Sequence, residues 1–147
     1  MIYFVGAGCG APDLITLRGA KLLREADAVV YTGSLINPAL LELVKPGCEL
    51  RNSATMALPE VIDALLRVHE AGGTAVRLHT GDPSVYGAIR EQMDLLSQAG
   101  VPFEICPGVS AFAGAAAAMR AEYTLPGVSQ SVILTRIAGK TPVPERE

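Results

Sequence analysis

Short apolar runs alternate along this chain with longer segments in which apolar residues recur at helical spacing. Residues 58–71, for example, carry apolar side chains every three or four positions and end at Gly72 and Gly73, which is typical of an amphipathic helix with a glycine stop. The predicted strands are residues 2–5, 28–31, 48–51, 74–79, 103–106 and 132–135. The predicted helices are residues 14–26 (with Asp13 as the cap), 38–44, 58–71, 87–99 and 110–119. Strands that alternate with helices indicate an α/β fold, with a mostly parallel open sheet and helices on both faces.

The composition is that of a folded domain. Half of the 147 residues are hydrophobic and 18% are charged, which disfavours disorder. A net charge of -3 argues against a general attraction to nucleic acid and leaves only a local basic patch as the alternative. The start lacks the basic and apolar regions of a signal peptide, and the longest apolar stretch, 111–119, is shorter than the roughly 20 residues that cross a bilayer. The three separated cysteines match neither a zinc pattern nor a disulfide framework. We therefore expect a cytoplasmic protein with no protein-bound metal and no membrane or nucleic-acid partner.

Three of the predicted strands end in turns rich in glycine or proline, at residues 6–10, 80–83 and 107–110. The carboxyl ends of parallel strands meet at one edge of an open sheet, and ligands bind at that edge. Glycine also lets a ligand approach bare backbone N–H groups. The three turns are therefore predicted to converge on one ligand crevice. The alternative is that the glycines only terminate strands.

The first turn also suggests a dinucleotide-binding site, because Gly6, Gly8 and Ala11 match the pattern G-x-G-x-x-A. Such sites carry an acidic residue at the far end of the second strand, where it binds the ribose. Here Tyr31 ends the second predicted strand and Thr-Gly-Ser follows it, while Asp27 lies at the opposite end. The sequence thus disfavours NAD or FAD.

Asp82 follows a predicted strand and precedes a proline, so its carboxylate is expected to project into the crevice. It could bind the ribose hydroxyls or an amino group of a ligand, or it could form an Asx-turn with its own downstream backbone. We expect replacement of Asp82 to weaken ligand binding with little effect on the melting temperature.

His79 is expected to be a packed strand residue rather than a base. No catalytic residue is assigned, because no Ser-His-Asp arrangement, HExxH motif or carboxylate metal loop can be defended.

Taken together, these turns resemble those of the tetrapyrrole methylase family, which includes uroporphyrinogen and precorrin methyltransferases. The matching stretches are VGAGCGAPDLITLRGAKLL (5–23), TGDPSVYGA (80–88) and PGVSA (107–111). Residues 123–136, with HTGD at 79–82 and GKTP at 139–142, look most like the branch that methylates C11 of precorrin-4 or cobalt-precorrin-4. The resemblance covers essentially the whole chain.

The resemblance implies two α/β domains with S-adenosylmethionine folded in the cleft between them. Residue-by-residue matching of the motifs implies that the cofactor contacts Thr80, Gly81, Asp82, Val85, Tyr86, Ser110 and Ala111. In such proteins the glycine loop faces the tetrapyrrole, which makes Gly8, Cys9 and Gly10 substrate-binding candidates. The family usually has proline where this chain has Cys9. Because the substrate carries many carboxylates, Arg18 and Arg136 are further candidates; the alternative is that both are ordinary solvated surface charges.

The function implied by the resemblance is S-adenosylmethionine-dependent C-methylation of a tetrapyrrole, at C11, in cobalamin (corrin ring) biosynthesis. The full-length enzyme would be a homodimer. The alternatives are a sister precorrin methylase that acts at another ring carbon and a non-catalytic nucleotide-binding module. Residues 1–138 would form the amino-terminal domain, and residues 139–147 a linker toward a second domain absent from this chain. Alone, this piece is expected to fold, to bind the cofactor weakly and to be inactive, because it would supply only one wall of the cleft.

Overall fold

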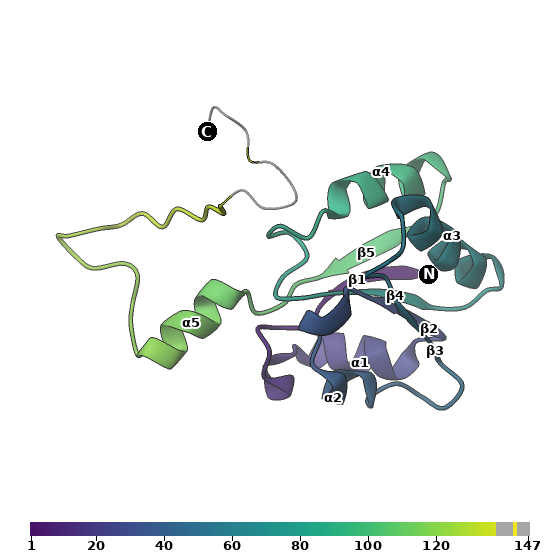
Figure 1. Ribbon diagram of the computed structural model, residues 1–147, viewed down its shortest axis with the longest axis horizontal. Coiled ribbons are helices and arrows are strands. Elements are labelled where there is room, and N and C mark those ends of the chain that lie inside the picture. Colours follow the sequence, from purple (N-terminus) through teal and green to yellow (C-terminus); the bar gives the residue numbers. More distant parts are fainter. Residues whose placement is uncertain (138–142, 144–147) are drawn as a thin grey trace. The chain divides into compact units, whose positions relative to one another are not determined.

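Five parallel strands form one sheet in the computed structural model of the chain, which describes residues 1–137 and 143. The strands are β1 (Ile2–Gly6), β2 (Ala28–Tyr31), β3 (Glu49–Asn52), β4 (Ala75–His79) and β5 (Phe103–Cys106). Their order across the sheet is β3-β2-β4-β1-β5, and each neighbouring pair runs parallel (Figure 1). The predicted α/β class with an open parallel sheet is confirmed.

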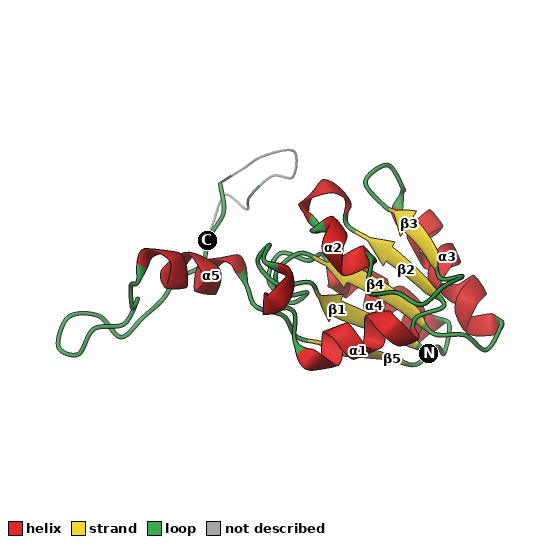
Figure 2. Cartoon of the chain, turned by 90° about the horizontal axis from the view of Figure 1, so that it is seen from below, coloured by secondary structure: helices red, strands yellow, loops and turns green. Residues whose placement is uncertain are grey.

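Helices cover both faces of this sheet. They are α1 (Leu17–Glu25), α2 (Pro38–Leu41), α3 (Leu58–Glu70) and α4 (Ile89–Gln98). The first two pack on one face and the other two on the opposite face (Figure 1; Figure 2). The chain moves across the sheet in one direction from β1 to β3 and in the other direction from β3 to β5. Right-handed connections then place the two pairs of helices on opposite faces.

Each face of the sheet has its own apolar core, which explains why β1 and β2 are largely apolar. Val29 and Leu78 belong to the core with α1 and α2, and Phe4 and Val30 belong to the core with α3 and α4. All five residues of β4 are buried, as expected of a central strand in a parallel sheet. The edge strand β3 is mostly exposed.

The start of α1 differs from the prediction. Pro12–Leu14 forms a 3-10 turn, and α1 begins after Thr16, whose Oγ1 accepts a hydrogen bond from the N–H of Gly19 at 3.0 Å. The predicted cap, Asp13, is wrong, because Asp13 lies inside the 3-10 turn. Proline fits the first position of such a turn, so the chain turns once at Pro12 before the longer helix starts.

The strand predicted at residues 132–135 is wrong as well, because these residues have no regular structure. A strand needs the backbone of a neighbour, and the described chain beyond α5 (Ala111–Met119) offers one isolated bridge, between Leu125 and Ser129.

The chain divides into two compact units: the first is Met1–Gly114, and the second begins at Ala115 and includes residues 132–135. The domain boundary at residue 138 stays a prediction, and the linker at 139–147 lies outside the described residues except for residue 143.

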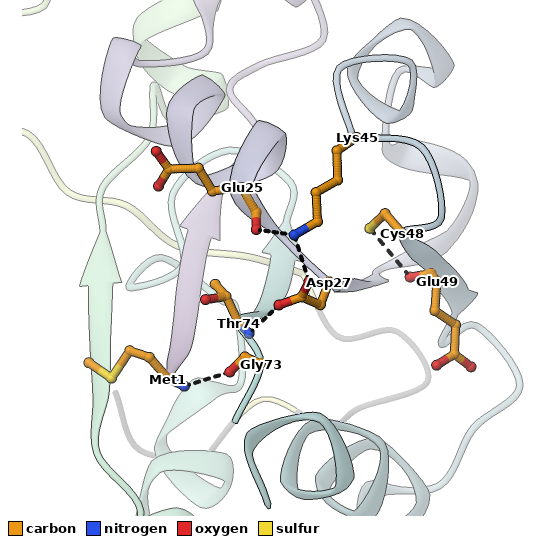
Figure 3. A network of polar contacts seen from close by, with 8 residues as sticks. All are labelled: Met1, Glu25, Asp27, Lys45, Cys48, Glu49, Gly73 and Thr74. Atoms are coloured by element: carbon orange, nitrogen blue, oxygen red, sulfur yellow. Dashed lines mark hydrogen bonds and ion pairs between the residues drawn. The ribbon is translucent and has the colours of Figure 1, made fainter. Parts of the chain in front are cut away.

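A polar network ties segments together at the amino-terminal edge of the sheet (Figure 3). Asp27, just before β2, accepts hydrogen bonds from Lys45 Nζ at 2.6 Å and from the N–H of Thr74 at 2.7 Å. Lys45 Nζ also donates to the carbonyl of Glu25 at 3.1 Å. The hydrogen bonds from Lys45 and then Thr74 hold the pKa of the Asp27 carboxyl below its ordinary value. The network therefore joins the end of α1 and the loop after α2 to the start of β4.

We predict that Asp27→Asn lowers the stability of the fold at neutral pH and that this loss disappears in acid. A carboxyl whose folded pKa is depressed stabilises the fold above its unfolded pKa of about 4, and this contribution vanishes as the pH falls through the folded pKa. Thermal unfolding of both proteins between about pH 3 and pH 7 measures the effect. Asp63→Asn, on the exposed face of α3, is the matched control and should change little at any pH. An Asp27→Asn deficit of the same size at both ends of the range would contradict the prediction.

Candidate functional site at the carboxyl edge of the sheet

The turns after β1 and β4 are joined by their backbones. The N–H of Gly8 donates to the carbonyl of Gly81 at 3.2 Å, and the N–H of Gly81 donates to the carbonyl of Gly8 at 2.8 Å. The N–H of Ala7 also donates to the carbonyl of His79 at 2.7 Å. This pair of reciprocal bonds extends the contact between β1 and β4 past the end of the parallel ladder.

The turn after β5 packs against both of these turns. A Cβ on Gly6 would lie 2.5 Å from Cα of Gly108 and 2.6 Å from the carbonyl oxygen of Gly81, closer than real Cβ atoms come. A Cβ on Gly108 would likewise overlap the carbonyl oxygen of Gly81. Gly6 and Gly108 are therefore required for close approach, not for an unusual φ. The predicted convergence of the three turns on one edge is confirmed, and the glycines do more than terminate strands.

The place where these turns meet is also where the chain path reverses. The connection after β1 leads to α1 on one face, while the connection after its neighbour β4 leads to α4 on the other face. The loops thus diverge from the carboxyl ends of β1 and β4, and open α/β sheets bind their ligands at such a switch point. The fold and this edge together define a ligand-binding α/β domain.

Asp82 links two of the turns through its side chain. Its Oδ1 accepts hydrogen bonds from the N–H of Ser84 at 2.8 Å and from the Ser84 hydroxyl, and its Oδ2 accepts from the N–H of Gly108 at 2.8 Å. Burial raises the pKa of Asp82, but the bonds from Ser84 and Gly108 lower it by more, so the net pKa lies below its ordinary value. The Asx-turn is therefore present. The bond from Gly108 also argues against the expectation that replacing Asp82 has little effect on stability. Contact between Asp82 and a cofactor stays a prediction.

The segment between Asp82 and α4 is a tight turn with a strained backbone. Tyr86 and Ala88 have positive φ values of 57° and 50°, which side chains rarely adopt. A Cβ on Gly87 would collide with the backbone of Pro83, so the turn closes on itself there. The Tyr86 side chain is 59% exposed although it is large and apolar. Strain that is maintained beside a candidate site is commonly connected with ligand binding.

The remaining cofactor candidates lie next to this turn. A Cβ atom on Gly81 would lie 3.6 Å from Cα of Ser110 and 3.7 Å from the backbone N of Ala111, so these residues are neighbours of Gly81. Thr80 directly follows the last residue of β4. The structure therefore brings the whole cofactor set into one region of the first compact unit: Thr80, Gly81, Asp82, Val85, Tyr86, Ser110 and Ala111.

The structure brings only some of the substrate-binding candidates near these turns. Gly8 is bonded to Gly81, and Cys9 packs so closely against α5 that a Cβ on Gly114 would lie 2.5 Å from its Sγ. Gly10 continues this loop with φ +116° and open space around it. Arg18 lies in the first turn of α1, so it begins near the carboxyl edge. Arg136 belongs to the unit that begins at Ala115, and its place relative to the turns stays a prediction.

Sequence reasoning missed buried polar groups directly beneath the turns. Arg77 in β4 and Gln92 in α4 are 7% and 4% exposed and are hydrogen-bonded to each other. The sequence signal for this pair is Arg77 itself, a charged residue in the middle of a mostly apolar strand.

The packed role expected of His79 is confirmed, since it is 2% exposed and stacks on Phe4. Burial, and then the charge of Arg77, lowers the pKa of His79 to about 3, so the imidazole is neutral at physiological pH.

Metal and membrane features are lacking in the described part of the chain. No three His, Cys, Asp or Glu side chains among the described residues gather in a way that could hold a metal ion. None of the helices in residues 1–137 combines the length and apolar character that crossing a membrane requires.

Comparisons with known proteins assign the family. The family model for tetrapyrrole (corrin/porphyrin) methylases matches residues 1–146. A Methanocaldococcus jannaschii protein named cobalt-precorrin-4 C(11)-methyltransferase is 53% identical over 146 residues, which cover 99% of this chain and 56% of that protein. The precorrin-4 C(11)-methyltransferase of Pseudomonas aeruginosa is 47% identical, with coverages of 99% and 58%. The chain belongs to the tetrapyrrole methylase family, and it spans little more than half the length of these relatives.

Solved structures agree with this assignment. A cobalt precorrin-4 methyltransferase, described as a cobalamin biosynthetic enzyme, superposes with a TM-score of 0.94 at 51% identity and covers 99% of this chain and 61% of its own. The uroporphyrin-III C-methyl transferase of Thermus thermophilus, solved in complex with S-adenyl homocysteine, superposes with a TM-score of 0.71 at 36% identity. That match covers 88% of this chain and 52% of the other.

We predict that Gly108→Ala destabilises the fold by roughly 3 kcal/mol, because a methyl group must push the turn away from both Gly6 and Gly81. The control is Gly100→Ala, where φ is +68° but nothing lies within 4 Å of the new Cβ. It should cost only the left-handed penalty of about 1 kcal/mol. Chemical denaturation of the two variants and the parent compares these values. Equal losses for the two variants would show that the turns can separate freely.

Proposed function

We propose that this chain provides the amino-terminal part of an S-adenosylmethionine-dependent methyltransferase that methylates C11 of precorrin-4 or cobalt-precorrin-4 in cobalamin biosynthesis. The observation that carries the proposal is the close similarity, over nearly the whole chain, to relatives named for this reaction. The converged glycine turns support it, since they lie at the edge where such a domain binds a ligand. Residues 1–138 would form one wall of the cofactor cleft, and a second domain would supply the other.

The chemistry of the turns suits this cofactor. Gly81 has no side chain and lies beside the start of α5, where the N–H groups of a first helical turn attract an anionic group such as a carboxylate. Tyr86 offers an exposed aromatic surface, and Val85 a partly buried apolar one, for the adenosyl or methionyl portion. Asp82 holds the turns after β4 and β5 together and keeps one carboxylate at their junction.

The reaction needs alignment more than acid or base. S-adenosylmethionine would supply a methyl group on a sulfonium. The ring carbon would form the new C–C bond with electrons donated by a neighbouring pyrrole nitrogen while the S–CH3 bond breaks to a neutral thioether, and the positive charge passed to the macrocycle would leave as a proton. The protein must hold the acceptor carbon in line with that bond and exclude water. His79 cannot serve as a base at the surface, because it is buried and its pKa is about 3. We propose that the turns act by positioning and assign no general base.

The glycine loop is the proposed neighbour of the tetrapyrrole. Gly10 is exposed with open space around it, so its backbone can face a large flat substrate. Gly8 is buried and bonded to Gly81, and Cys9 packs against Gly114, so these two residues would fix the loop beside the substrate. Arg18 is exposed at the start of α1, where a guanidinium can pair with a substrate carboxylate. The same role is proposed for Arg136.

Methyl transfer by the complete enzyme tests the proposal. Incubation with ¹³C-methyl-labelled S-adenosylmethionine and either precorrin-4 or cobalt-precorrin-4 should add one methyl group, measured by mass, and NMR should assign it to C11. A methyl group on another ring carbon would identify a sister precorrin methylase. Binding of adenosine nucleotides with no binding of S-adenosylmethionine would replace the enzyme hypothesis with a nucleotide-binding module.

We predict that Asp82→Asn weakens S-adenosylmethionine binding about tenfold, which corresponds to about 1.4 kcal/mol. The amide keeps one acceptor oxygen but presents an NH2 group to the other donor, so the bond from either Ser84 or Gly108 is lost and the junction of the turns after β4 and β5 loosens. The melting temperature should also fall, and this loss should shrink in acid, because the folded pKa of Asp82 is depressed.

Calorimetric titration and thermal unfolding of the complete enzyme measure these effects. Ser84→Ala serves as the comparison, since it removes the hydroxyl bond to Asp82 and leaves the bond to Gly108. Its affinity loss should be smaller. An Asp82→Asn enzyme with unchanged affinity would reduce Asp82 to an Asx-turn residue.

A further inference from the structure

A buried cation that forms no salt bridge with any described residue lies beneath the candidate cofactor turn. Arg77 is 7% exposed in the central strand β4, and burial lowers its pKa to about 10, which leaves it charged at neutral pH. Its hydrogen bonds go to neutral groups: Nε donates to Gln92 Oε1 at 3.1 Å, and Nη1 donates to the carbonyl of Val30 at 3.1 Å and to Ser53 Oγ at 2.9 Å. Among the described residues, no salt bridge of Arg77 is present. A buried charge without a salt bridge opposes folding. The hydrogen bonds of Arg77 therefore indicate which groups it holds in place.

The guanidinium fixes the orientation of the Gln92 side chain. Arg77 can only donate hydrogen bonds, so the oxygen of the Gln92 amide must face it. The amide nitrogen then points the other way and donates to the carbonyl of Ala88 at 3.1 Å. Gln92 is 4% exposed, and water therefore has little access to compete for these bonds.

Ala88 is the point where the strained turn meets α4. It is the residue before the helix, with φ 50°, and Tyr86 two residues earlier has φ 57°. The left-handed region costs a non-glycine residue roughly 1 kcal/mol or more, so something must hold the backbone there. The bond from Gln92 to the Ala88 carbonyl provides such a hold on the turn that carries Val85 and Tyr86.

The other end of the network reaches the neighbouring turns. Ser53, just after β3, accepts from Arg77 and donates its hydroxyl to the carbonyl of Tyr31 at 3.0 Å, at the end of β2. Arg77 thus connects the carboxyl ends of β2 and β3 to the turn after β4. The sheet, which is rigid, fixes the guanidinium, and the guanidinium fixes the amide of Gln92.

We propose that Gln92, oriented by Arg77, is a positioning residue that holds the Tyr86–Ala88 backbone in the conformation that binds S-adenosylmethionine. This inference rests on the proposed function. Gln92 touches no cofactor itself; it acts through the carbonyl of Ala88. A neutral amide is required because one side chain must accept from a cation and donate to a carbonyl at the same time.

Gln92→Glu in the complete enzyme separates positioning from stability. A carboxylate of the same shape still accepts from Arg77 and compensates its charge, so the melting temperature should be unchanged or raised. It cannot donate to the Ala88 carbonyl and faces it with a like partial charge. We expect the Kd and the KM for S-adenosylmethionine to rise about tenfold, with a smaller change in kcat. Gln98→Glu, the same substitution on an exposed position of α4, is the matched control and should leave both constants unchanged.

The outcomes distinguish this inference from the function on which it rests. If the parent enzyme does not bind S-adenosylmethionine, the proposed function fails. If the parent binds and a folded Gln92→Glu variant binds equally well, the positioning role is overturned while the function stands. Should Gln92→Glu not fold, Ser53→Ala tests the far end of the network. Loss of one anchor of Arg77 should weaken cofactor binding two- to threefold, and unchanged affinity there would also overturn the inference.

Discussion

The close approach of three backbone turns at the carboxyl edge of the sheet is the constraint on which the rest of the site depends. Gly6 and Gly108 lie so near each other, and so near the carbonyl of Gly81, that no side chain fits between them. The bonds between Gly8 and Gly81 and the bond from Gly108 to Asp82 then hold the turns together. Everything proposed for the cofactor follows from this junction, because it gathers residues 80–86 and 110–111 in one place.

The strand order makes such a junction possible. Because β1 and β4 are neighbours whose connections lead to helices on opposite faces, their carboxyl ends form a switch point of the kind at which open α/β sheets bind ligands. The two apolar cores secure the sheet from both sides, and the Asp27 network fixes its opposite edge. The buried side chains of Arg77 and Gln92 lie on the side of α4, below the strained turn. The Asp27 network and the candidate site thus lie at opposite ends of the same strands.

Much of this could be predicted from the sequence, for identifiable reasons. The buried strand β2 is a continuous apolar run and was predicted with the bounds observed, as was the half-exposed edge strand β5, which ends at Pro107 and Gly108. Glycine turns after strands also predicted the edge where the candidate site lies. The cap of α1 was missed because Pro12 starts a separate turn, and the strand at 132–135 because a strand depends on a neighbour that periodicity cannot reveal. The role of Gln92 was invisible, since it arises from a partner in β4 and a strained carbonyl at Ala88, contacts that no local pattern encodes.

The central claim is that the junction of the three turns binds the cofactor. A crystal structure of the complete enzyme with S-adenosylhomocysteine tests it most directly. The account predicts that the ligand contacts the backbone of residues 80–82 and 110–111 and packs against Val85 or Tyr86, with the bond between Asp82 and Gly108 retained. A ligand that is bound in the enzyme without touching any of these residues would contradict the account.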